Sequence, residues 1–325
     1  MNDLSKDAVN RLAVDEAGAG QRVDNFLLKV LKGVPKSHIY RILRSGEVRV
    51  NRLRVKPDAR LAVGDVLRIP PIRTGVPETG KRKAPPLSPS IPILYEDDAL
   101  IAVDKPAGLA VHGGSGVAFG LIEQMRAARP TAKFLELVHR LDRDTSGVML
   151  IAKKRAALVG LHAALREGRV DKRYQILVKG HWRDAKRAVT LPLTKFLTSS
   201  GERRVRVEED EGGQTAKTVF YRRRVWAGID PPMSLLDAKL FTGRTHQIRV
   251  HLTHLGFALA GDEKYGDFAW NKALSKQGLK RMFLHARRLV FAHPLEEREV
   301  EIESALPADL SRFLDALDSK RPPDA

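Results

Sequence analysis

The sequence has no cysteine among its 325 residues. Disulfide bonds, thiolate ligands for metals and cysteine nucleophiles are therefore excluded. Long hydrophobic runs are also missing, since no stretch approaches the roughly 18 apolar residues that a membrane span needs. Residues 1–10 carry Asp3 and Asp7 and lack the apolar segment of a secretory signal. We therefore expect a protein of the cytoplasm.

Acidic residues are in the minority, with 39 Asp and Glu against 57 Lys and Arg. The net charge of +18 and the pI of about 10.2 indicate a polyanionic partner, of which nucleic acid is the commonest. An anionic membrane surface is the alternative, but no predicted helix combines a basic face with a broad apolar one. Hydrophobic residues make up 43% of the chain, which is typical of a globular protein, and the length allows about two domains.

A compact module is predicted over residues 20–70. The apolar spacing of an amphipathic helix is found at Val23, Phe26, Leu27, Val30 and Leu31. A second helix is expected after Pro35, with Ser37 as a candidate N-cap and an end near Gly46. Short β-like runs follow at 48–50, 53–55 and 66–69.

The polar positions of this module are predominantly basic and are opposed mainly by Glu47 and Asp58. The basic residues that we select as candidates for contacts with a phosphate backbone are Lys36, Arg41, Arg44, Arg49, Arg52, Arg54 and Lys56. Such contacts supply affinity without reading a base sequence. The alternative is a solvated charged face, although charges of alternating sign would be usual there.

Proline and glycine recur through residues 71–90, where no periodic apolar pattern survives. We interpret this stretch as an extended linker between the module and a larger domain at 91–320, with residues 1–19 as an N-terminal tail. Strand patterns of the larger domain are found at 93–95, 99–103, 174–178, 217–226, 235–241, 284–291 and 300–303, and helix patterns at 119–128, 158–165, 248–255 and 310–317. Loops are expected at 105–108 and 111–116. This mixture predicts an α+β fold built on mixed or antiparallel sheets.

A charged segment, His139–Gly147, lies between two apolar runs. This arrangement indicates a rigid loop presented by a sheet, and functional residues often lie on such loops. Asp142 is flanked by Arg140 and Arg143, and a nearby cation keeps a carboxylate ionised and available as a nucleophile. The alternative is a solvated turn whose local ion pairs carry little energy.

The pattern His-Arg-Leu-Asp followed by Thr-Ser-Gly in this loop resembles the signature of the RluA-type pseudouridine synthases. The segment from Arg22 through Gly46–Asn51 to Asp65 resembles an S4 RNA-binding domain, which makes the seven basic residues above candidate RNA-binding residues. The resemblance implies a pseudouridine synthase fold with an active-site cleft across the sheet. It also implies isomerisation of uridine to pseudouridine in RNA, with no cofactor and no metal.

The resemblance implies roles for individual residues as well. Asp142 occupies the position of the catalytic Asp. Tyr174 matches a Lys-x-Tyr pattern whose Tyr packs on the target base. Ile248 and Arg249 match a pair that lines the active site, in which the Arg pairs with the catalytic Asp. Arg140 matches the position whose side chain enters the space that the flipped nucleotide vacates.

The loop around residues 111–116 and the segment 134–147 are most similar to family members that modify several separate uridines of 23S ribosomal RNA. We therefore expect large-subunit ribosomal RNA as the partner, a monomer, and no membrane or DNA partner. Two alternatives stay open, namely a non-catalytic RNA-binding protein of ribosome assembly and a tRNA pseudouridine synthase. A zinc site at His246, His251 and His254 is disfavoured, because no Cys or Glu completes a ligand set at the usual spacing.

Overall fold

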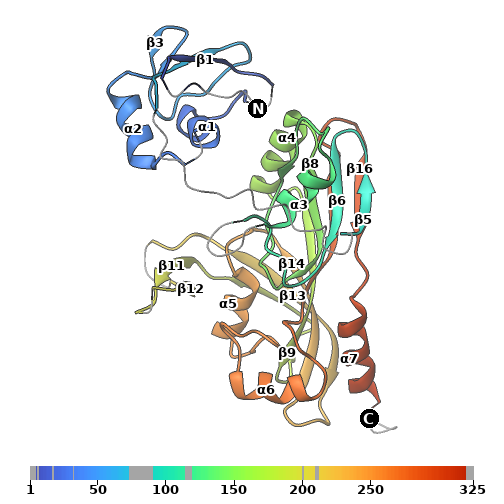
Figure 1. The fold of residues 1–325 in the computed structure, drawn as a ribbon. Helices are drawn as coiled ribbons and strands as arrows, with labels where there is room; N and C mark the ends of the chain where they lie inside the picture. The colour runs from blue at the N-terminus through green and yellow to red at the C-terminus, as the bar shows by residue number, and fades with distance from the viewer. Residues whose placement is uncertain are drawn as a thin grey trace. The chain divides into compact units, whose positions relative to one another are not determined.

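The computed structural model describes residues 5, 7–16, 18–31, 33–72, 91–113, 119–199, 201–208 and 212–319 (Figure 1). The chain forms two compact units, residues 1–83 and 84–325. Most of the predicted linker (73–90), part of the predicted glycine-rich loop (114–118) and both chain ends lie outside the described residues. In the described ranges, a helix with the length and apolar character needed to cross a bilayer is not found.

The N-terminal unit consists of a four-stranded antiparallel sheet, in the order β1-β4-β2-β3, and two helices. Its elements are β1 (Asn10–Ala13), α1 (Val23–Val30), α2 (Lys36–Arg44), β2 (Arg49–Val50), β3 (Leu53–Arg54) and β4 (Val66–Ile69). Both helices pack apolar side chains into one core, including Phe26 and Leu27 from α1 and Ile39 and Ile42 from α2. The two helices and three strands predicted from the sequence are therefore confirmed.

Three details of the predicted module are wrong. β1 falls in the expected tail of residues 1–19, yet it pairs with β4 along its whole length; four residues are too few for a recognisable apolar period. Pro35 is the N-cap of α2, so Ser37 lies inside the first turn. Ile72, assigned to the linker, is buried in the core of the unit. The folded unit therefore extends beyond the predicted residues 20–70 at both ends.

The larger unit is built on one ten-stranded sheet in the order β10-β13-β14-β9-β15-β8-β6-β5, with β16 paired to β15 and β7 paired to β8. Its strands are β5 (Ile93–Glu96), β6 (Leu100–Lys105), β7 (Glu136–Leu137), β8 (Ser146–Ala152), β9 (Asp171–Lys179), β10 (Lys186–Thr190), β13 (Lys217–Trp226), β14 (Met233–Leu240), β15 (Leu284–Ala292) and β16 (Glu299–Glu303). Within this sheet the described pairs are antiparallel except β15 with β8. The predicted strands are confirmed.

A separate two-stranded sheet and five helices complete the larger unit. They are β11 (Leu193–Leu197), β12 (Arg203–Val207), α3 (Leu121–Ala128), α4 (Arg155–Arg166), α5 (Gln247–His254), α6 (Phe268–Lys276) and α7 (Ala308–Asp318). Four of these helices were predicted. β10, β11, β12 and α6 were missed. Each of the three strands has only five residues and carries Lys or Arg, which is too short and too polar for a clear apolar alternation.

Both faces of the central sheet are covered. Ile101 and Met149 belong to the cluster that α3 and α5 cover, whereas Leu100 and Leu150 belong to the cluster that α4 covers. Alternate residues of a strand point to opposite faces, so strands buried on both faces are continuously apolar. This explains why the run 148–152 is so clear in the sequence.

The start of β8 determines where the preceding charged loop ends. Gly147 has φ +112°, and a Cβ built there would lie 2.2 Å from the carbonyl oxygen of Ala286 on β15. Only glycine permits this approach of the two parallel strands. The Gly at the end of the motif is therefore required by strand packing, and it holds the loop against β15.

Candidate active site

Asp142 lies in the loop between β7 and β8, and 19% of its side chain is exposed. The loop turns back on itself, because the N–H of Thr145 donates to the carbonyl oxygen of Asp142 at 3.2 Å. The flanking Arg143 pairs with Asp144 at 3.2 Å rather than with Asp142. The expectation that Arg143 is the cation beside Asp142 is therefore wrong, since its side chain is exposed on the outside of the turn.

Lys105, at the end of β6, holds this loop through hydrogen bonds. It is completely buried, and its Nζ donates to the carbonyl oxygens of Pro106 (2.9 Å), Leu109 (2.8 Å) and Arg143 (2.9 Å). Burial lowers the pKa of Lys105 to about 7. The sequence indicated only a loop at 105–108, because the carbonyl partner at Arg143 is distant in the chain.

Arg249, on α5, joins two carboxylates. Its Nη1 donates to Asp142 Oδ2 at 2.9 Å, while Nε and Nη2 donate to the two oxygens of Asp262 at 2.7 and 2.8 Å. The backbone N–H groups of Lys264 and Tyr265 also donate to Asp262. Burial alone would lower the pKa of Arg249, but the bonds to both carboxylates raise it above its ordinary value. The guanidinium therefore stays charged and holds Asp142 in one orientation.

Asp262 is the residue that the sequence pattern missed in this network. Its side chain is inaccessible to solvent, and burial by itself would raise its pKa. The hydrogen bonds and charge of Arg249 outweigh this effect, so the pKa of Asp262 is lowered. No spacing in the sequence assigned a partner to this carboxylate.

Two cavities, of about 80 Å³ and about 830 Å³, meet at Asp142. The residues that line both are Arg140, Leu141, Asp142, His246 and Arg249. Arg140 is exposed at this position. The structure therefore brings the predicted catalytic carboxylate, the predicted arginine partner and Arg140 to one opening.

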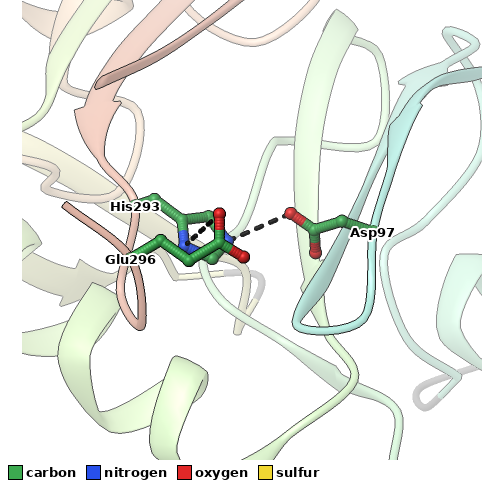
Figure 2. Close-up of side chains that lie close together, drawn as sticks. All are labelled: Asp97, His293 and Glu296. Atoms are coloured by element: carbon green, nitrogen blue, oxygen red, sulfur yellow. Dashed lines mark hydrogen bonds and ion pairs between the residues drawn. The ribbon is translucent and has the colours of Figure 1, made fainter. Parts of the chain in front are cut away.

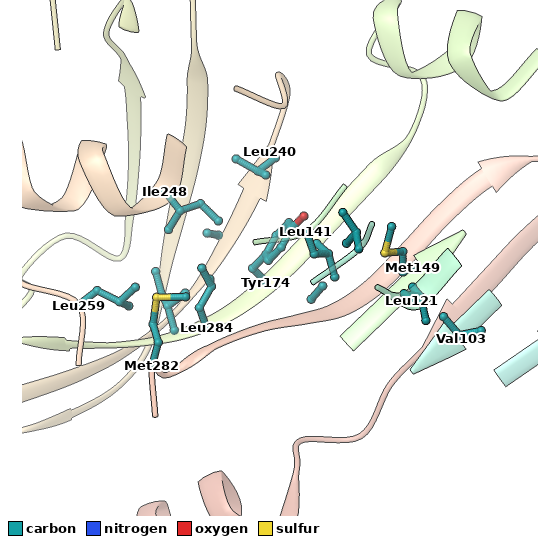
Figure 3. Close-up of a cluster of buried hydrophobic side chains, with 14 of the residues drawn as sticks. Val103, Leu121, Leu141, Met149, Tyr174, Leu240, Ile248, Leu259, Met282 and Leu284 are labelled. Carbon is teal, nitrogen blue, oxygen red and sulfur yellow. The ribbon is translucent and has the colours of Figure 1, made fainter. Parts of the chain in front are cut away.

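Tyr174 and Ile248 line the smaller cavity. Figure 3 shows them among the aliphatic side chains of the main core cluster, which includes Leu141 and Leu284. Only 8% of Tyr174 is exposed, and burial together with the Asp142 charge raises its pKa above the ordinary value. A pocket lined by an aromatic ring and aliphatic side chains, with a carboxylate nearby, suits a flat heterocyclic base.

His246 is the N-cap of α5 and lies beside Asp142. Its backbone is left-handed, with φ 54° and ψ 22°, a conformation that costs a non-glycine residue about 1 kcal/mol or more. Its Nε2 is 3.8 Å from Asp142 Oδ2, and its Nδ1 is 2.8 Å from the hydroxyl of Tyr265. The sequence pointed only to the disfavoured zinc site for this histidine.

His251, which also lies on α5, has a structural role. His251 is buried, with Nδ1 3.1 Å from Thr218 Oγ1 and Nε2 3.2 Å from the carbonyl oxygen of Leu191. Both ring nitrogens are therefore engaged in hydrogen bonds, so His251 is unsuited as a zinc ligand.

Among the described residues, one group has the spacing of metal ligands: Asp97, His293 and Glu296 (Figure 2). His293 Nε2 lies 3.0 Å from Asp97, and its Nδ1 lies 3.7 Å from Glu296. Arg298 already pairs with both carboxylates. Because the cationic side chain of Arg298 already pairs with both carboxylates, we interpret the group as a set of ion pairs that links the β5–β6 turn to the end of β15.

The seven candidate RNA-binding residues of the N-terminal unit are all exposed: Lys36, Arg41, Arg44, Arg49, Arg52, Arg54 and Lys56. The sheet adds two basic residues that the sequence analysis did not select. In the strand register, Arg11 on β1 pairs with Arg68 on β4. Arg68 also pairs with Arg49 on β2, and Arg49 pairs with Arg54 on β3. These four residues, here called the arginine ladder, cross all four strands.

The arginine ladder is held by neutral partners. Arg49, Arg54 and Arg68 donate to the carbonyl oxygens of Gly46, Ser45 and Glu47, respectively. In the described part of the chain, no carboxylate forms an ion pair with a ladder residue. A hollow of about 1050 Å³ is lined by Arg11, Arg49, Arg52 and Arg68 with neighbouring residues, of which one, Glu47, is acidic. Like charges directly opposite each other repel, so a polyanion in the hollow would relieve the repulsion.

Comparison with known proteins now bears on both units. The S4 domain model matches residues 21–67, and the RNA pseudouridylate synthase model matches residues 99–254. Ribosomal large subunit pseudouridine synthase C of Pasteurella multocida (strain Pm70) is 47% identical over 315 residues, which cover 95% of this chain and 94% of that protein. The chain belongs to the RNA pseudouridylate synthase family.

Further relatives of this RNA pseudouridylate synthase agree. The protein of the same name from Escherichia coli (strain K12) is 47% identical over 324 residues, covering 97% of this chain and 98% of that protein. The structure of Human RNA Pseudouridylate Synthase Domain Containing 4 matches with a TM-score of 0.55 and 25% identity, over 70% of this chain and 93% of that one. The predicted resemblance and the α+β fold with an S4 domain are thereby confirmed.

Proposed function

We propose that this RNA pseudouridylate synthase converts uridines of large-subunit (23S) ribosomal RNA to pseudouridine, with Asp142 as the catalytic residue. The observation that carries the proposal is the half-buried carboxylate of Asp142, held by Arg249 at the mouth of a pocket that Tyr174 and aliphatic side chains help to line. The substrate is supported by the relatives, which are named ribosomal large subunit pseudouridine synthase C. A cytoplasmic location and a monomeric working unit belong to the same proposal.

The reaction breaks the N1–C1′ bond, turns the uracil while it stays bound, and joins C5 to C1′. N1 gains a proton and C5 loses one, so no group donor is consumed. Asp142 acts at the sugar end of the nucleotide, either as a nucleophile or by assisting loss of a proton from the sugar. Arg249 keeps the carboxylate oriented in both routes through the hydrogen bond from its Nη1.

Hydrolysis of the same bond would need a second carboxylate to direct a water molecule. Asp262 is the obvious candidate, since Arg249 joins it to Asp142. However, Asp262 is buried, and both of its oxygens already accept hydrogen bonds from Arg249. It has no access to water, so Asp262 is unsuited to that role.

The remaining roles follow from position. Tyr174 stacks on the flipped uracil, and Ile248 forms an apolar wall of the same pocket. Arg140, which is exposed at the mouth, enters the space that the nucleotide leaves in the RNA and offsets an unstacking cost of a few kcal/mol. The seven basic residues of the N-terminal unit and the arginine ladder contact RNA phosphates.

The test is release of tritium from RNA labelled at uridine C5, with protein-free large-subunit ribosomal RNA as substrate. Wild type should release tritium, Asp142→Asn should be slower by about 10⁴-fold, and Asp144→Asn, in the same loop, should retain activity. Binding of RNA without release by wild type would favour a non-catalytic assembly protein. Release from bulk tRNA but not from ribosomal RNA would refute the proposed substrate.

A further inference from the structure

His246 is a strained residue that faces the reacting centre. Its side chain is 16% exposed and lines both cavities at Asp142, while its backbone occupies the left-handed region. Residues in such conformations persist where the surrounding structure holds them, and they are frequent at functional sites. The left-handed turn starts α5 and brings the imidazole to 3.8 Å from Asp142. The roles described above leave this imidazole unused.

The hydroxyl of Tyr265 is the hydrogen-bonding partner of His246 Nδ1. The Tyr265 oxygen accepts a hydrogen bond from the N–H of Val205 at 2.9 Å, and it lies 2.8 Å from His246 Nδ1. A tyrosine hydroxyl has one proton to donate, and Nδ1 is the acceptor in place to receive it. The proton of a neutral imidazole is then on Nε2, the nitrogen that faces Asp142. Burial lowers the pKa of His246, which keeps the ring neutral at pH 7.

We propose that His246 is a further catalytic residue, whose Nε2–H donates a hydrogen bond to O2 of the target uracil. The inference rests on the proposed isomerisation. Nε2 lies beside the carboxylate that acts at the C1′ end of the nucleotide, and O2 is the base carbonyl next to N1. O4 lies on the far side of the ring, so a donor close to Asp142 is placed for O2.

The chemistry gives this hydrogen bond a purpose. When the N1–C1′ bond breaks, its electron pair stays with the uracil and negative charge spreads from N1 onto O2 and O4. A fixed donor at O2 stabilises this charge as it develops. The neutral ring provides the donor without competing with Arg249 for the Asp142 carboxylate. Tyr265 acts as a positioning residue, because it sets the tautomer and does not contact the substrate.

Replacement of His246 by Gln or by Asn distinguishes the role of the hydrogen-bond donor from the role of the left-handed backbone. The amide nitrogen of Gln extends to about the place of Nε2, whereas Asn is shorter but tolerates left-handed backbone better. Single-turnover rates should fall by about 100-fold in His246→Ala and His246→Asn, and by about 10-fold or less in His246→Gln. RNA affinity should change little in all three. Equal or higher activity of His246→Asn than of His246→Gln would show that backbone geometry is what matters and overturn the proposal.

The tautomer is tested directly by ¹⁵N NMR of histidine-labelled protein. Wild type should show His246 protonated at Nε2, and Tyr265→Phe should shift the ring towards a mixture of tautomers. A wild-type ring protonated at Nδ1 would overturn the inference whatever the kinetics. Thermal unfolding of Tyr265→Phe, which also loses the bond from Val205, is the control for folding.

A synthetic RNA containing one uridine that wild type modifies tests the acceptor. Replacing that uridine by 2-thiouridine weakens the acceptor at position 2, so wild type should slow by about 10-fold while His246→Ala should be almost insensitive. Equal slowing of both proteins would exclude contact with O2. Absence of tritium release by wild type from unsubstituted large-subunit ribosomal RNA would instead refute the proposed function itself, so the two failures are distinguishable.

Discussion

The two units of this protein use arginine in opposite ways. In the larger unit, Arg249 is buried and joins Asp142 to Asp262. In the N-terminal unit, Arg11, Arg68 and neighbouring ladder residues lie opposite one another, and the side chain of Arg68 donates to a neutral carbonyl oxygen. A buried charge with a partner on each side fixes the positions of those partners. Surface charges that repel one another favour the binding of an anion, because the anion relieves the repulsion. The difference shows that arginine serves two separate purposes in this chain.

The largest effect is expected when the buried pair is broken. Asp262→Asn leaves Arg249 buried with only one carboxylate, so the free energy of unfolding of the larger unit should fall by about 3 kcal/mol. Tryptophan fluorescence in urea measures this unit alone, because Trp182, Trp226 and Trp270 all belong to it. Asp144→Asn removes an exposed pair with Arg143 and should cost about 0.5 kcal/mol or less. Equal losses in the two variants would contradict the contrast.

Acid should remove part of the same stabilisation. Because the pKa of Asp262 is lowered in the folded protein, its contribution is present above the unfolded-state pKa of about 4 and is lost as pH falls through the folded value. The stability of wild type should therefore decline below about pH 4 more steeply than that of Asp262→Asn. Urea titrations at several pH values check this, and parallel curves would mean that Asp262 is not linked to stability.

A smaller effect is expected on RNA affinity when the ladder is shortened. Arg11→Gln removes one cation from the hollow, so the slope of log affinity against log salt should decrease by about 0.7 to 0.9. Filter binding over a range of salt concentrations measures it. Arg60→Gln, in the same unit but outside the ladder, is the control and should change the slope less. Equal changes would show that only net charge matters.

The smallest effect should have the opposite sign. Without RNA, Arg11→Gln relieves repulsion by Arg68, so pairing of β1 with β4 should gain about 0.2 to 0.5 kcal/mol at low salt. Salt screens this repulsion, so the gain should vanish at about 1 M. Amide hydrogen exchange in β4 reports on this unit locally. A loss of protection at low salt would argue against repulsion within the ladder.

Much of the fold could be predicted because apolar periodicity is a local property. Helices α1 and α2 and the apolar strand β8 follow from residues within each segment. The strands β10 to β12 did not, because they are polar and gain their place by pairing with neighbours. The same reason explains β1, whose four residues become a strand only beside β4.

The candidate site divides in the same way. The charged loop with Asp142, and the pair Ile248 and Arg249 at the start of α5, were selected from contiguous motifs in the sequence. Lys105, Asp262 and Tyr265 were not selected, because each acts through a partner that no local pattern names. Arg143 shows the reverse error, since the neighbour in sequence is not the neighbour in space.

The sequence by itself determined the chemistry available: a basic chain without cysteine, an S4-like module, and a loop that presents Asp142. Tertiary structure alone decided how the charges are used. Contacts between distant segments place Arg249 between two carboxylates and turn His246 towards Asp142. Strand register lines up Arg11 with Arg68. The physical reason is that electrostatic interactions depend on distance and burial, which only the folded chain defines.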